Sequence, residues 1–578
     1  MGAPHLIMPA RINGIEKIMK TQGLDFDTLT LMLEALDDFT TGKLPLDRRL
    51  ELDHEDVCPE DIIRAMCGDE LGVQLVFVPE EYGGMGGGAF DSYRVCERLA
   101  RIDVGVATSV FATFLGSDPL MFGGTPAQKE KWLGRIVTDG ILLAYGATEP
   151  EAGSDLGALR TTAAPIRADG DGADGPVTGY KINGRKQWIS NGSIADVCTV
   201  LALTPGGPSW FVVEKGTDGF TSAKPEDKHG IRLSNTAALY LDDVVVPVEN
   251  LVGGQEGRGL VIAQQVFGYT RLMVAAFGLG AGWAALDRAI EYSASRVQGG
   301  KVLAEKQGYT HKLIVPHAVR LEAARAFMEE TAARIDGGEG ENGALNTEGA
   351  IAKYLASEAG NAAAEAAIQA HGGYGYTKPY VVEKIKRDVR ITTIYEGTSE
   401  ILEMTIARDR WQRHLKTNGE HYRDIARGLG RMLSPEVGAD TAALALECLA
   451  SVLDACRAGR LTRSQHVLLR LGELIAHAEG AAGLARRAAE AAMDALPEKA
   501  DRRFDAATLA AISRVYARDA AMKVAEEGLR WVCGALPSGA AELADSLPLA
   551  AVRAAQAGLV ADMDLVADAL YGRGRDGA

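Results

Sequence analysis

Glu396 is the side chain whose type and setting most strongly suggest chemistry. It stands in the run IYEGT (residues 394–398), where a glycine follows the carboxylate and a helical pattern begins at Ser399. A carboxylate in a dry site can act as a general base. A carboxylate just before a helix can instead complement the positive end of the helix dipole. From spacing alone, this structural role is favoured over catalysis.

His371 is a second candidate base. It lies in the run QAHGGYGY (residues 369–376), at the end of a helical pattern and before two glycines. An imidazole titrates near neutral pH, which suits acid–base chemistry. A histidine in this setting is more often a capping or packing residue, and we predict that role.

Two further runs could hold a ligand. In TEPEAGSD (residues 148–155), Gly153 lets the backbone approach a ligand, and Thr148 and Ser154 can donate hydrogen bonds. In KQWISNG (residues 186–192), Trp188 precedes Ser190 by two positions, so both point to one side of a strand and could flank a flat cofactor. Residue chemistry alone favours an ordinary β-turn for the first run and a core tryptophan for the second.

Four successive blocks must position these side chains. We expect a mainly α fold with a central β domain: an α-helical N-terminal domain with an N-terminal extension, a small β-barrel-like middle domain, a four-helix bundle that carries Glu396, and an additional C-terminal helical domain. Their expected bounds are 1–140, 141–255, 256–420 and 421–578.

Strands are predicted from β-branched and aromatic runs at 197–203, 210–213, 237–241 and 244–246. Long helices are predicted at 271–295, 310–336, 346–370 and 399–413. No βαβ alternation occurs, which disfavours a Rossmann-type fold.

Composition narrows the class of function. The formal net charge of -17 disfavours a nucleic-acid role and a polybasic membrane role. Seven cysteines without CxxC spacing disfavour a zinc site and a disulfide framework, so no metal is expected. The N-terminal run MGAPHLIMPARING has no export or anchoring signal. We therefore expect a soluble, cytoplasmic protein.

Taken together and in this order, the three motif runs resemble those of the acyl-CoA dehydrogenase family, over roughly residues 25–415. TEPEAGSD matches the first family signature, and residues 369–401 match the second family signature almost throughout. The resemblance implies an FAD cofactor bound without a Rossmann fold. It implies that Ser190 points at the flavin N5 and that Ser154 lies near the pyrophosphate.

The resemblance also carries over individual site residues. The implied cofactor-binding residues are Tyr145, Ala147, Thr148, Ser154, Trp188, Ser190, Arg296, Gln369, Gly373 and Thr398. The implied substrate-binding residues are Ser154, Arg271 and Glu396. In the family the adenine end of FAD is held partly by a neighbouring subunit, here through Arg296, Gln369 and Gly373, so a homo-oligomer is expected. The family's aromatic-glycine pair after the arginine is replaced here by Gly299-Gly300, so the usual aromatic contact to adenine is not expected at that place.

The resemblance implies a mechanism in which Glu396 takes the α-proton of a saturated acyl-CoA and FAD N5 takes the β-hydride, giving a trans-2-enoyl-CoA. The backbone N–H of Glu396 and a ribityl hydroxyl of FAD would stabilise the charge on the thioester oxygen. Some relatives carry the base just before an arginine of the bundle. That position here is Thr270, so Glu396 has no competitor there.

Substrate and partners follow less directly from the resemblance. The pocket floor would fall at residues 111–115, which contain no arginine, so a monocarboxylic acyl chain is favoured over glutaryl-CoA. The C-terminal block resembles the long-chain, dimeric branch of the family, which implies a dimer, a medium or long acyl chain and a place in fatty acid β-oxidation. Electron-transferring flavoprotein is the expected electron acceptor. Residues 421–436 are only weakly amphipathic, so contact with the inner membrane would be peripheral at most. The alternatives are an acyl-CoA oxidase using dioxygen, or a non-catalytic flavoprotein with an assembly or nucleic-acid-protecting role.

Overall fold

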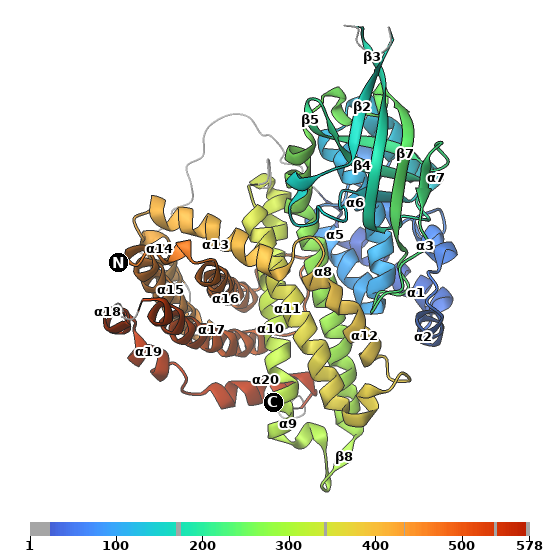
Figure 1. The fold of residues 1–578 in the computed structure, drawn as a ribbon. Coiled ribbons are helices and arrows are strands. Elements are labelled where there is room, and N and C mark those ends of the chain that lie inside the picture. Colours follow the sequence, from blue (N-terminus) through green and yellow to red (C-terminus); the bar gives the residue numbers. More distant parts are fainter. Residues whose placement is uncertain (1–22, 169–174, 340–343, 433, 537–539, 574–578) are drawn as a thin grey trace, which may run out of the picture.

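The computed structural model describes residues 23–168, 175–339, 344–432, 434–536 and 540–573. Helices come first, then a sheet, then a helical bundle, then further helices (Figure 1). This order confirms the predicted fold class, mainly α with a central β domain. The expectation about the N-terminal run falls outside the described residues.

Seven helices form the first block, and prolines set some of their boundaries. α2 and α3 begin directly after Pro45 and Pro59. Asp103 caps α6 by accepting hydrogen bonds from the N–H groups of Gly105 and Val106. The helices are α1 (Phe26–Lys43), α2 (Leu46–Glu55), α3 (Glu60–Met66), α4 (Gln74–Phe77), α5 (Ala89–Ile102), α6 (Val104–Gly123) and α7 (Pro126–Asp139).

One seven-stranded sheet follows. Its strands are β1 (Leu143–Gly146), β2 (Thr162–Arg167), β3 (Val177–Ser190), β4 (Val197–Thr204), β5 (Gly207–Glu214), β6 (Phe220–Ser222) and β7 (Thr236–Pro247). β1 and β2 both pair in parallel with β4, and β3, β7 and β6 follow β2. The two strands predicted at 237–241 and 244–246 are one strand, because a bulge at Asp243, with φ of 50°, lets β7 stay paired with β3. Among the described residues, no strand pairing closes the sheet into a barrel.

The bundle is built on α8 (Gly259–Ser295), α10 (Val315–Arg334), α11 (Asn346–His371) and α13 (Ser399–Lys416). α8 and α11 approach closely because glycines face each other; a Cβ on Gly360 would lie 2.1 Å from the carbonyl oxygen of Gly278. The helix predicted at 310–336 is in fact two, α9 (Gln307–Leu313) and α10, since the chain breaks at Ile314 before Pro316. The hairpin of β8 (Val297–Gln298) and β9 (Lys301–Val302) follows α8, and α12 (Val382–Val389) follows α11.

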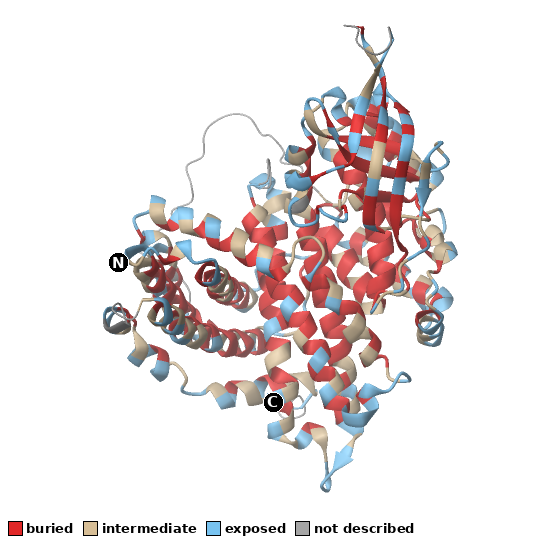
Figure 2. Ribbon diagram, in the orientation of Figure 1, coloured by how far each residue is buried: buried red, intermediate tan, exposed pale blue. Residues whose placement is uncertain are grey.

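Two of these helices have the length and apolar composition of a membrane span. In α6, 89% of the apolar window is buried inside the fold, and in α8 the share is 65%. Their apolar character is therefore explained by packing between the sheet, the N-terminal helices and the bundle (Figure 2).

The last block packs on the bundle rather than standing apart. Its helices are α14 (Glu420–Met432), α15 (Ala439–Ala458), α16 (Gln465–Ala492), α17 (Ala506–Ala535), α18 (Ala540–Ser546), α19 (Leu549–Ala554) and α20 (Leu559–Leu570). A Cβ on Gly472 of α16 would lie 2.1 Å from the carbonyl oxygen of Glu403 in α13. One hydrophobic core joins these helices to the bundle and the N-terminal helices. α14 buries Tyr422, Ala426 and Leu429, so its apolar face is covered by the protein itself.

Candidate active site

Glu396 lies in a turn with unusual backbone geometry. Its φ is 54° and that of Gly397 is 98°, so two consecutive residues are left-handed just before α13. A non-glycine residue in this region costs free energy, and such residues occur at functional sites as well as in turns. The helix cap is Thr398, whose Oγ1 accepts from the N–H of Ile401 at 3.3 Å. Glu396 is thus not the capping residue, contrary to what spacing alone favours.

Three side chains surround the Glu396 carboxylate. Thr270 Oγ1 of α8 donates to Glu396 Oε2 at 3.1 Å. Burial raises the pKa of Glu396, while the Thr270 hydrogen bond and the charges of Arg271 and Lys353 act to lower it. Lys353 donates to the carbonyl oxygen of Gly397 at 2.5 Å, and burial lowers its own pKa to about 7. The carboxylate therefore combines a raised pKa with a fixed orientation, as a general base requires.

The runs 148–155 and 186–192 lie side by side. The N–H of Gln187 donates to the carbonyl oxygen of Thr148 at 2.9 Å. Beneath them, the fully buried Lys186 ammonium donates to Glu149 Oε1 at 2.7 Å and to the Leu201 carbonyl oxygen at 2.6 Å. The other Glu149 hydrogen bonds come from the N–H groups of Arg160 (2.7 Å) and Thr161 (3.0 Å). This buried pair positions the predicted ligand loop.

Trp188 is held out of the core. The end of β3 is bulged around it, its φ is 55°, and it remains 62% exposed. The interpretation as a core tryptophan is therefore wrong. Ile189 is buried between Trp188 and the half-buried Ser190. Asn191 anchors this strand end by donating to the Ser109 carbonyl oxygen of α6 at 2.8 Å.

Tyr145 brings the sheet close to the candidate base. Its ring packs on Trp210 with centroids 4.7 Å apart, and its hydroxyl is buried. Burial raises its pKa well above the usual value, and the charge of Glu396 adds to that rise. Ala147 and Thr148 continue the chain from this point. Tyr145, Thr270, Arg271, Thr398 and Glu396 thus belong to one region.

A cavity of about 360 Å³ opens beside the same turn. Its lining includes two cations, Lys386 and Arg390, and the first residues of α13. The lining residues are Glu358, Asn361, Lys386, Arg390, Thr393, Ile394, Thr398, Ser399 and Glu400. The positive end of the 18-residue helix α13 together with Lys386 and Arg390 suits a phosphate-bearing ligand, although Glu358 and Glu400 also line the cavity.

Three predicted cofactor residues lie at the far end of the bundle, and a fourth, Ser154, lies in an exposed loop. Arg296 follows the end of α8, about 25 residues beyond Arg271, which is about 37 Å at 1.5 Å per residue. Gln369 and Gly373 lie exposed where α11 ends. Ser154 is exposed in the loop after β1, and no hydrogen bond joins it to Glu396 among the described residues.

An aromatic group lines the distant end of the bundle. The Arg296 guanidinium lies 5.5 Å from the ring centroid of Tyr374, which is 46% exposed. His371 is buried, stacks on Tyr292 at 4.5 Å and hydrogen-bonds the Ala367 carbonyl oxygen at 2.7 Å through Nδ1. The predicted packing role of His371 is confirmed.

Sequence reasoning does not single out three buried charged residues. Glu149 and Lys186 stand in the two ligand runs, but 37 positions separate them and nothing in the sequence pairs them. Asp118 is buried in α6, and the charge of Glu396 contributes to a raised pKa of its carboxyl group. Its only signal was an acid inside an otherwise apolar helical pattern.

Comparisons with known proteins agree with this geometry. The family models for the acyl-CoA dehydrogenase N-terminal, middle and C-terminal domains match residues 27–139, 144–244 and 257–410. The acryloyl-CoA reductase (NADH) of Anaerotignum propionicum is 37% identical over 364 residues, which are 62% of this chain and 88% of that protein. The acyl-CoA dehydrogenase of Bacillus subtilis (strain 168) is 39% identical over 366 residues, 62% of this chain and 91% of that protein.

A solved structure extends the likeness to the last block of helices. It is an acyl-CoA dehydrogenase complexed with FAD from Bacillus anthracis, with a TM-score of 0.80 and 25% identity over 96% of this chain and 97% of that one. The chain therefore belongs to the acyl-CoA dehydrogenase family and is an FAD-dependent oxidoreductase acting on a CH–CH group.

Proposed function

We propose that the protein dehydrogenates a saturated acyl-CoA to a trans-2-enoyl-CoA, with Glu396 as the base that removes the α-proton. The observation that carries this proposal is the left-handed turn at Glu396 and Gly397, which leaves helix capping to Thr398 and turns the carboxylate toward Thr270. A carboxylate with no capping role, a raised pKa and a fixed hydrogen bond is suited to proton abstraction.

The chain's own residues would prepare that step. Burial makes the charged carboxylate less stable and so more basic, while Thr270 fixes its orientation. Lys353 holds the Gly397 carbonyl oxygen, which steadies the turn that carries the base. The N–H of Glu396 is a candidate donor to the thioester oxygen as negative charge develops there.

The described residues also fit FAD. When bound, FAD supplies the hydride acceptor at N5. Tyr145, Ala147, Thr148, Trp188, Ser190 and Thr398 would hold the flavin half, with Ser154 near the pyrophosphate. In support, the bulge of β3 keeps the Trp188 indole exposed, and the cavity beside Thr398 offers helix N–H groups and two cations.

The adenine half would be held by a second copy of the chain. Arg296 lies about 37 Å along α8 from Arg271, whose charge acts on Glu396, so a single FAD on the Glu396 side would not span this separation. The Arg296, Gln369 and Gly373 group would therefore serve the FAD of a neighbouring subunit, with Tyr374 as the nearest aromatic ring. We propose a homo-oligomer, with a dimer favoured.

The acyl chain would enter between α6 and α8. Phe111 contacts Phe277 of α8 edge-on at 5.7 Å, and Phe114 stacks on Phe77 at 3.8 Å. These aromatic contacts suit an acyl chain without a distal carboxylate. The proposal also includes a medium or long acyl chain, electron transfer to electron-transferring flavoprotein and a role in β-oxidation. It further includes a cytoplasmic location, with peripheral membrane contact at most.

An anaerobic titration tests the reaction. Purified protein with bound flavin is mixed with straight-chain acyl-CoAs of four to sixteen carbons, and flavin absorbance is followed. Bleaching by one length range supports dehydrogenation, whereas no bleaching by any thioester contradicts it.

A second measurement decides the electron acceptor. The bleached protein is exposed either to air or to electron-transferring flavoprotein. Fast reoxidation by the flavoprotein and slow reoxidation by air supports a dehydrogenase; fast reoxidation by air would identify an oxidase.

A further inference from the structure

Lys353 of α11 is a completely buried lysine whose charge has no role in the reaction described so far. Its side chain has no exposed surface, and its ammonium donates to the Gly397 carbonyl oxygen at 2.5 Å. An ammonium carries three N–H donors. No second hydrogen bond of Lys353 occurs among the residues that the structure describes. Burying a cation is costly unless a nearby anion compensates it, and one neutral carbonyl does not do so.

The anion that Lys353 approaches is the candidate base. The Gly397 peptide follows Glu396 directly, so the hydrogen bond holds the ammonium within about 9 Å of the Glu396 Cα. Arg271 of α8 approaches the same place, because a Cβ on Gly397 would lie 4.0 Å from Arg271 Nη2. The charge of Glu396 acts on both cations. The turn that carries one buried carboxylate is therefore flanked by two buried cations, one from each of two helices.

α11 holds this turn on both sides of Thr398. Lys353 binds the residue before Thr398, and Glu358 of α11 accepts a hydrogen bond from Ser399 Oγ, one residue after it, at 2.6 Å. The backbone of Glu396 and Gly397 is left-handed, and such a conformation persists only where the surrounding structure fixes it. Lys353 is thus one of the groups that fix the direction of the Glu396 side chain.

The ammonium form of Lys353 is present where protonation of Glu396 would limit the reaction. Burial lowers the pKa of Lys353 to about 7, although the charge of Glu396 opposes this effect. Lys353 is therefore charged on the acid side of neutrality. The other groups that face one or both of these residues are Thr270 and Arg271 of α8, Glu358 of α11, Glu400 of α13, Asp118 of α6 and Tyr145 of β1.

Proton abstraction moves the negative charge of this site but does not remove it. Before the step, the charge lies on the Glu396 carboxylate. After it, Glu396 is neutral and the charge lies on the thioester oxygen, for which the Glu396 N–H is the candidate donor. That N–H belongs to the same turn, so a cation held at Gly397 stabilises the charge in both positions. Such a cation keeps the base ionised without opposing the transfer.

We propose that Lys353 is a positioning residue that acts through its charge as well as its hydrogen bond: it holds the turn that aims Glu396, and it stabilises the Glu396 carboxylate until the proton is transferred. This inference rests on the proposed function. It assigns to α11 a part in the chemistry, although Lys353 itself contacts neither of the two carbon atoms that react.

The pH profile of flavin bleaching tests this inference. The bleaching rate at saturating acyl-CoA is measured by stopped flow from about pH 5.5 to 9. Lys353→Met removes the charge and the donor, Lys353→Gln removes the charge but keeps a donor, and Lys353→Arg keeps both. We expect the acidic limb to move to higher pH by about one unit in the Met and Gln variants, the order that a unit charge gives at this range and an effective dielectric of about 20. Lys353→Arg should keep the wild-type limb.

Lys416→Gln is the control, because Lys416 is exposed in the last turn of α13, about 25 Å along that helix from Ser399. Bound flavin per subunit verifies that each variant folds. An unmoved limb in folded Lys353→Met or Lys353→Gln overturns the proposal, even where the rate falls at every pH. An equal shift in Lys353→Arg or in the control also overturns it, as does loss of flavin from both uncharged variants, which would make Lys353 a residue of the fold alone.

The same experiment separates this inference from the proposed function. If an acyl-CoA bleaches the wild type and the limb does not move in the Lys353 variants, only the role of Lys353 fails. If no thioester bleaches the wild type, or if bleaching survives in Glu396→Gln, the proposed function fails with it.

Discussion

At the scale of single residues, the backbone around Glu396 separates catalysis from helix capping. The sequence IYEGT fits both roles, because a carboxylate before a helix is common in either. The observed left-handed turn moves the cap to Thr398 and gives Glu396 a partner from another helix, Thr270. Conformation at two residues thus excludes Glu396 as the helix cap, which spacing alone could not do, and is consistent with its proposed role as the base.

Replacing Glu396 with glutamine should remove the base without removing the cofactor. We expect Glu396→Gln to lower kcat by about 100-fold to 10,000-fold, the usual contribution of a positioned base, with flavin content unchanged. Stopped-flow bleaching with the best acyl-CoA measures the effect. Glu365→Gln is the control, since Glu365 is an acid of α11 with its side chain 69% exposed and does not line the cavity beside Thr398. Equal losses in both variants would contradict a specific role for Glu396.

Which site residues the sequence could predict depends on whether their roles are local. His371 was predicted to pack because a helix end beside two glycines is a local pattern, and it does stack on Tyr292. Residue chemistry alone favours a core position for Trp188, whereas the family resemblance implies a cofactor contact. The side chain points outward because of a bulge formed with β7, which no local pattern in the sequence predicts. Asp118 has only a weak signal in the sequence, an acid inside an apolar helical pattern, because the groups whose charges influence it come from elements distant in sequence.

At the scale of elements, a buried ion pair connects two strand ends that carry predicted cofactor-binding residues. Glu149 follows β1 and Lys186 lies near the end of β3, and both are almost completely inaccessible to solvent. Removing one member of a buried pair leaves the other charged and unpaired, which commonly costs about 3–5 kcal/mol. The loop with Thr148 and the bulge with Trp188 depend on this pair.

We therefore expect Lys186→Met to destabilise the middle domain by about 3 kcal/mol and to loosen the flavin. The measurement is the temperature at which flavin fluorescence rises as the cofactor is released. Lys181→Met is the control, because Lys181 lies on the same strand with its side chain 46% exposed in a surface pair with Asp243. A release temperature for Lys186→Met equal to that of the control would show that the pair does not secure the loop.

Element boundaries were predictable where a breaker residue sets them. Pro45 and Pro59 directly precede α2 and α3, and a proline is a break that the sequence shows directly. The break between α9 and α10 was missed, although Pro316 lies there, because apolar spacing continues across it. The sequence also does not show that the two strands predicted at 237–241 and 244–246 form the single strand β7. The bulge that makes them continuous depends on pairing with β3 and not on the residues of β7 alone.

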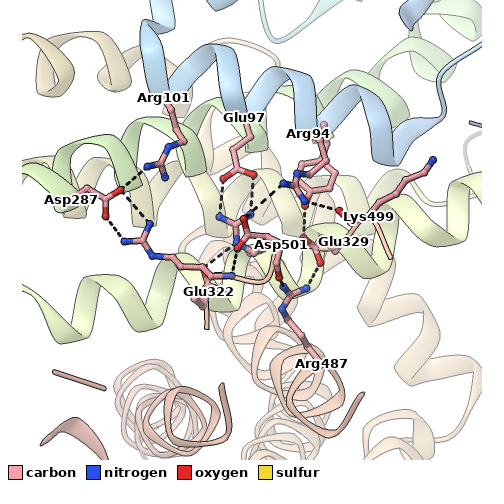
Figure 3. A network of polar contacts seen from close by, with 12 residues as sticks. Arg94, Glu97, Arg101, Asp287, Glu322, Glu329, Arg487, Lys499 and Asp501 are labelled. Atoms are coloured by element: carbon pink, nitrogen blue, oxygen red, sulfur yellow. Dashed lines mark hydrogen bonds and ion pairs between the residues drawn. The ribbon is translucent and has the colours of Figure 1, made fainter. Parts of the chain in front are cut away.

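At the scale of the whole molecule, a network of ion pairs and hydrogen bonds connects the C-terminal helices to the N-terminal helices and the bundle. The segment between α16 and α17 lies against α5 and α10, as Figure 3 shows. Asp501 of this segment lies 3.8 Å from Arg325, which also binds Glu97 of α5 at 2.7 Å. Lys499 donates to Asp91 at 2.7 Å, and Arg487 of α16 pairs with Glu329 of α10.

Asp501 should make stability depend on acid. Burial alone would raise its pKa, but Arg325 and Arg94 outweigh that effect and hold the pKa well below the usual range. A carboxyl group with a lowered folded-state pKa stabilises the fold above its unfolded pKa of about 4, and this contribution is lost as pH falls further. We expect Asp501→Asn to cost about 3 kcal/mol from neutral pH down to about pH 4.5, and progressively less below that.

Urea unfolding at several pH values measures this dependence. Asp494→Asn is the matched control, because Asp494 lies in the same segment with its side chain 97% exposed. A cost for Asp501→Asn that stays constant down to the lowest pH would show that its ionised form is not what stabilises the fold.

The proposed sharing of FAD between subunits would make the oligomer part of the active site, and complementation tests this proposal. Arg296→Ala should weaken FAD binding from the adenine side, whereas Glu396→Gln removes the base, so each homo-oligomer has little activity. A mixed dimer contains one Arg296→Ala chain and one Glu396→Gln chain. If FAD is shared, one site combines Glu396 of the Arg296→Ala chain with Arg296 of the Glu396→Gln chain, and the other site lacks both side chains. Coexpressed and separately tagged chains should therefore recover about half of the wild-type activity per dimer, with one tightly held flavin. If each subunit bound its FAD alone, the mixed dimer would contain one site without the base and one without Arg296, and its activity would not exceed the average of the two parents. The separation of Arg296 from Arg271 along α8 predicts the first result, because no rotation of side chains can close about 37 Å within one bundle.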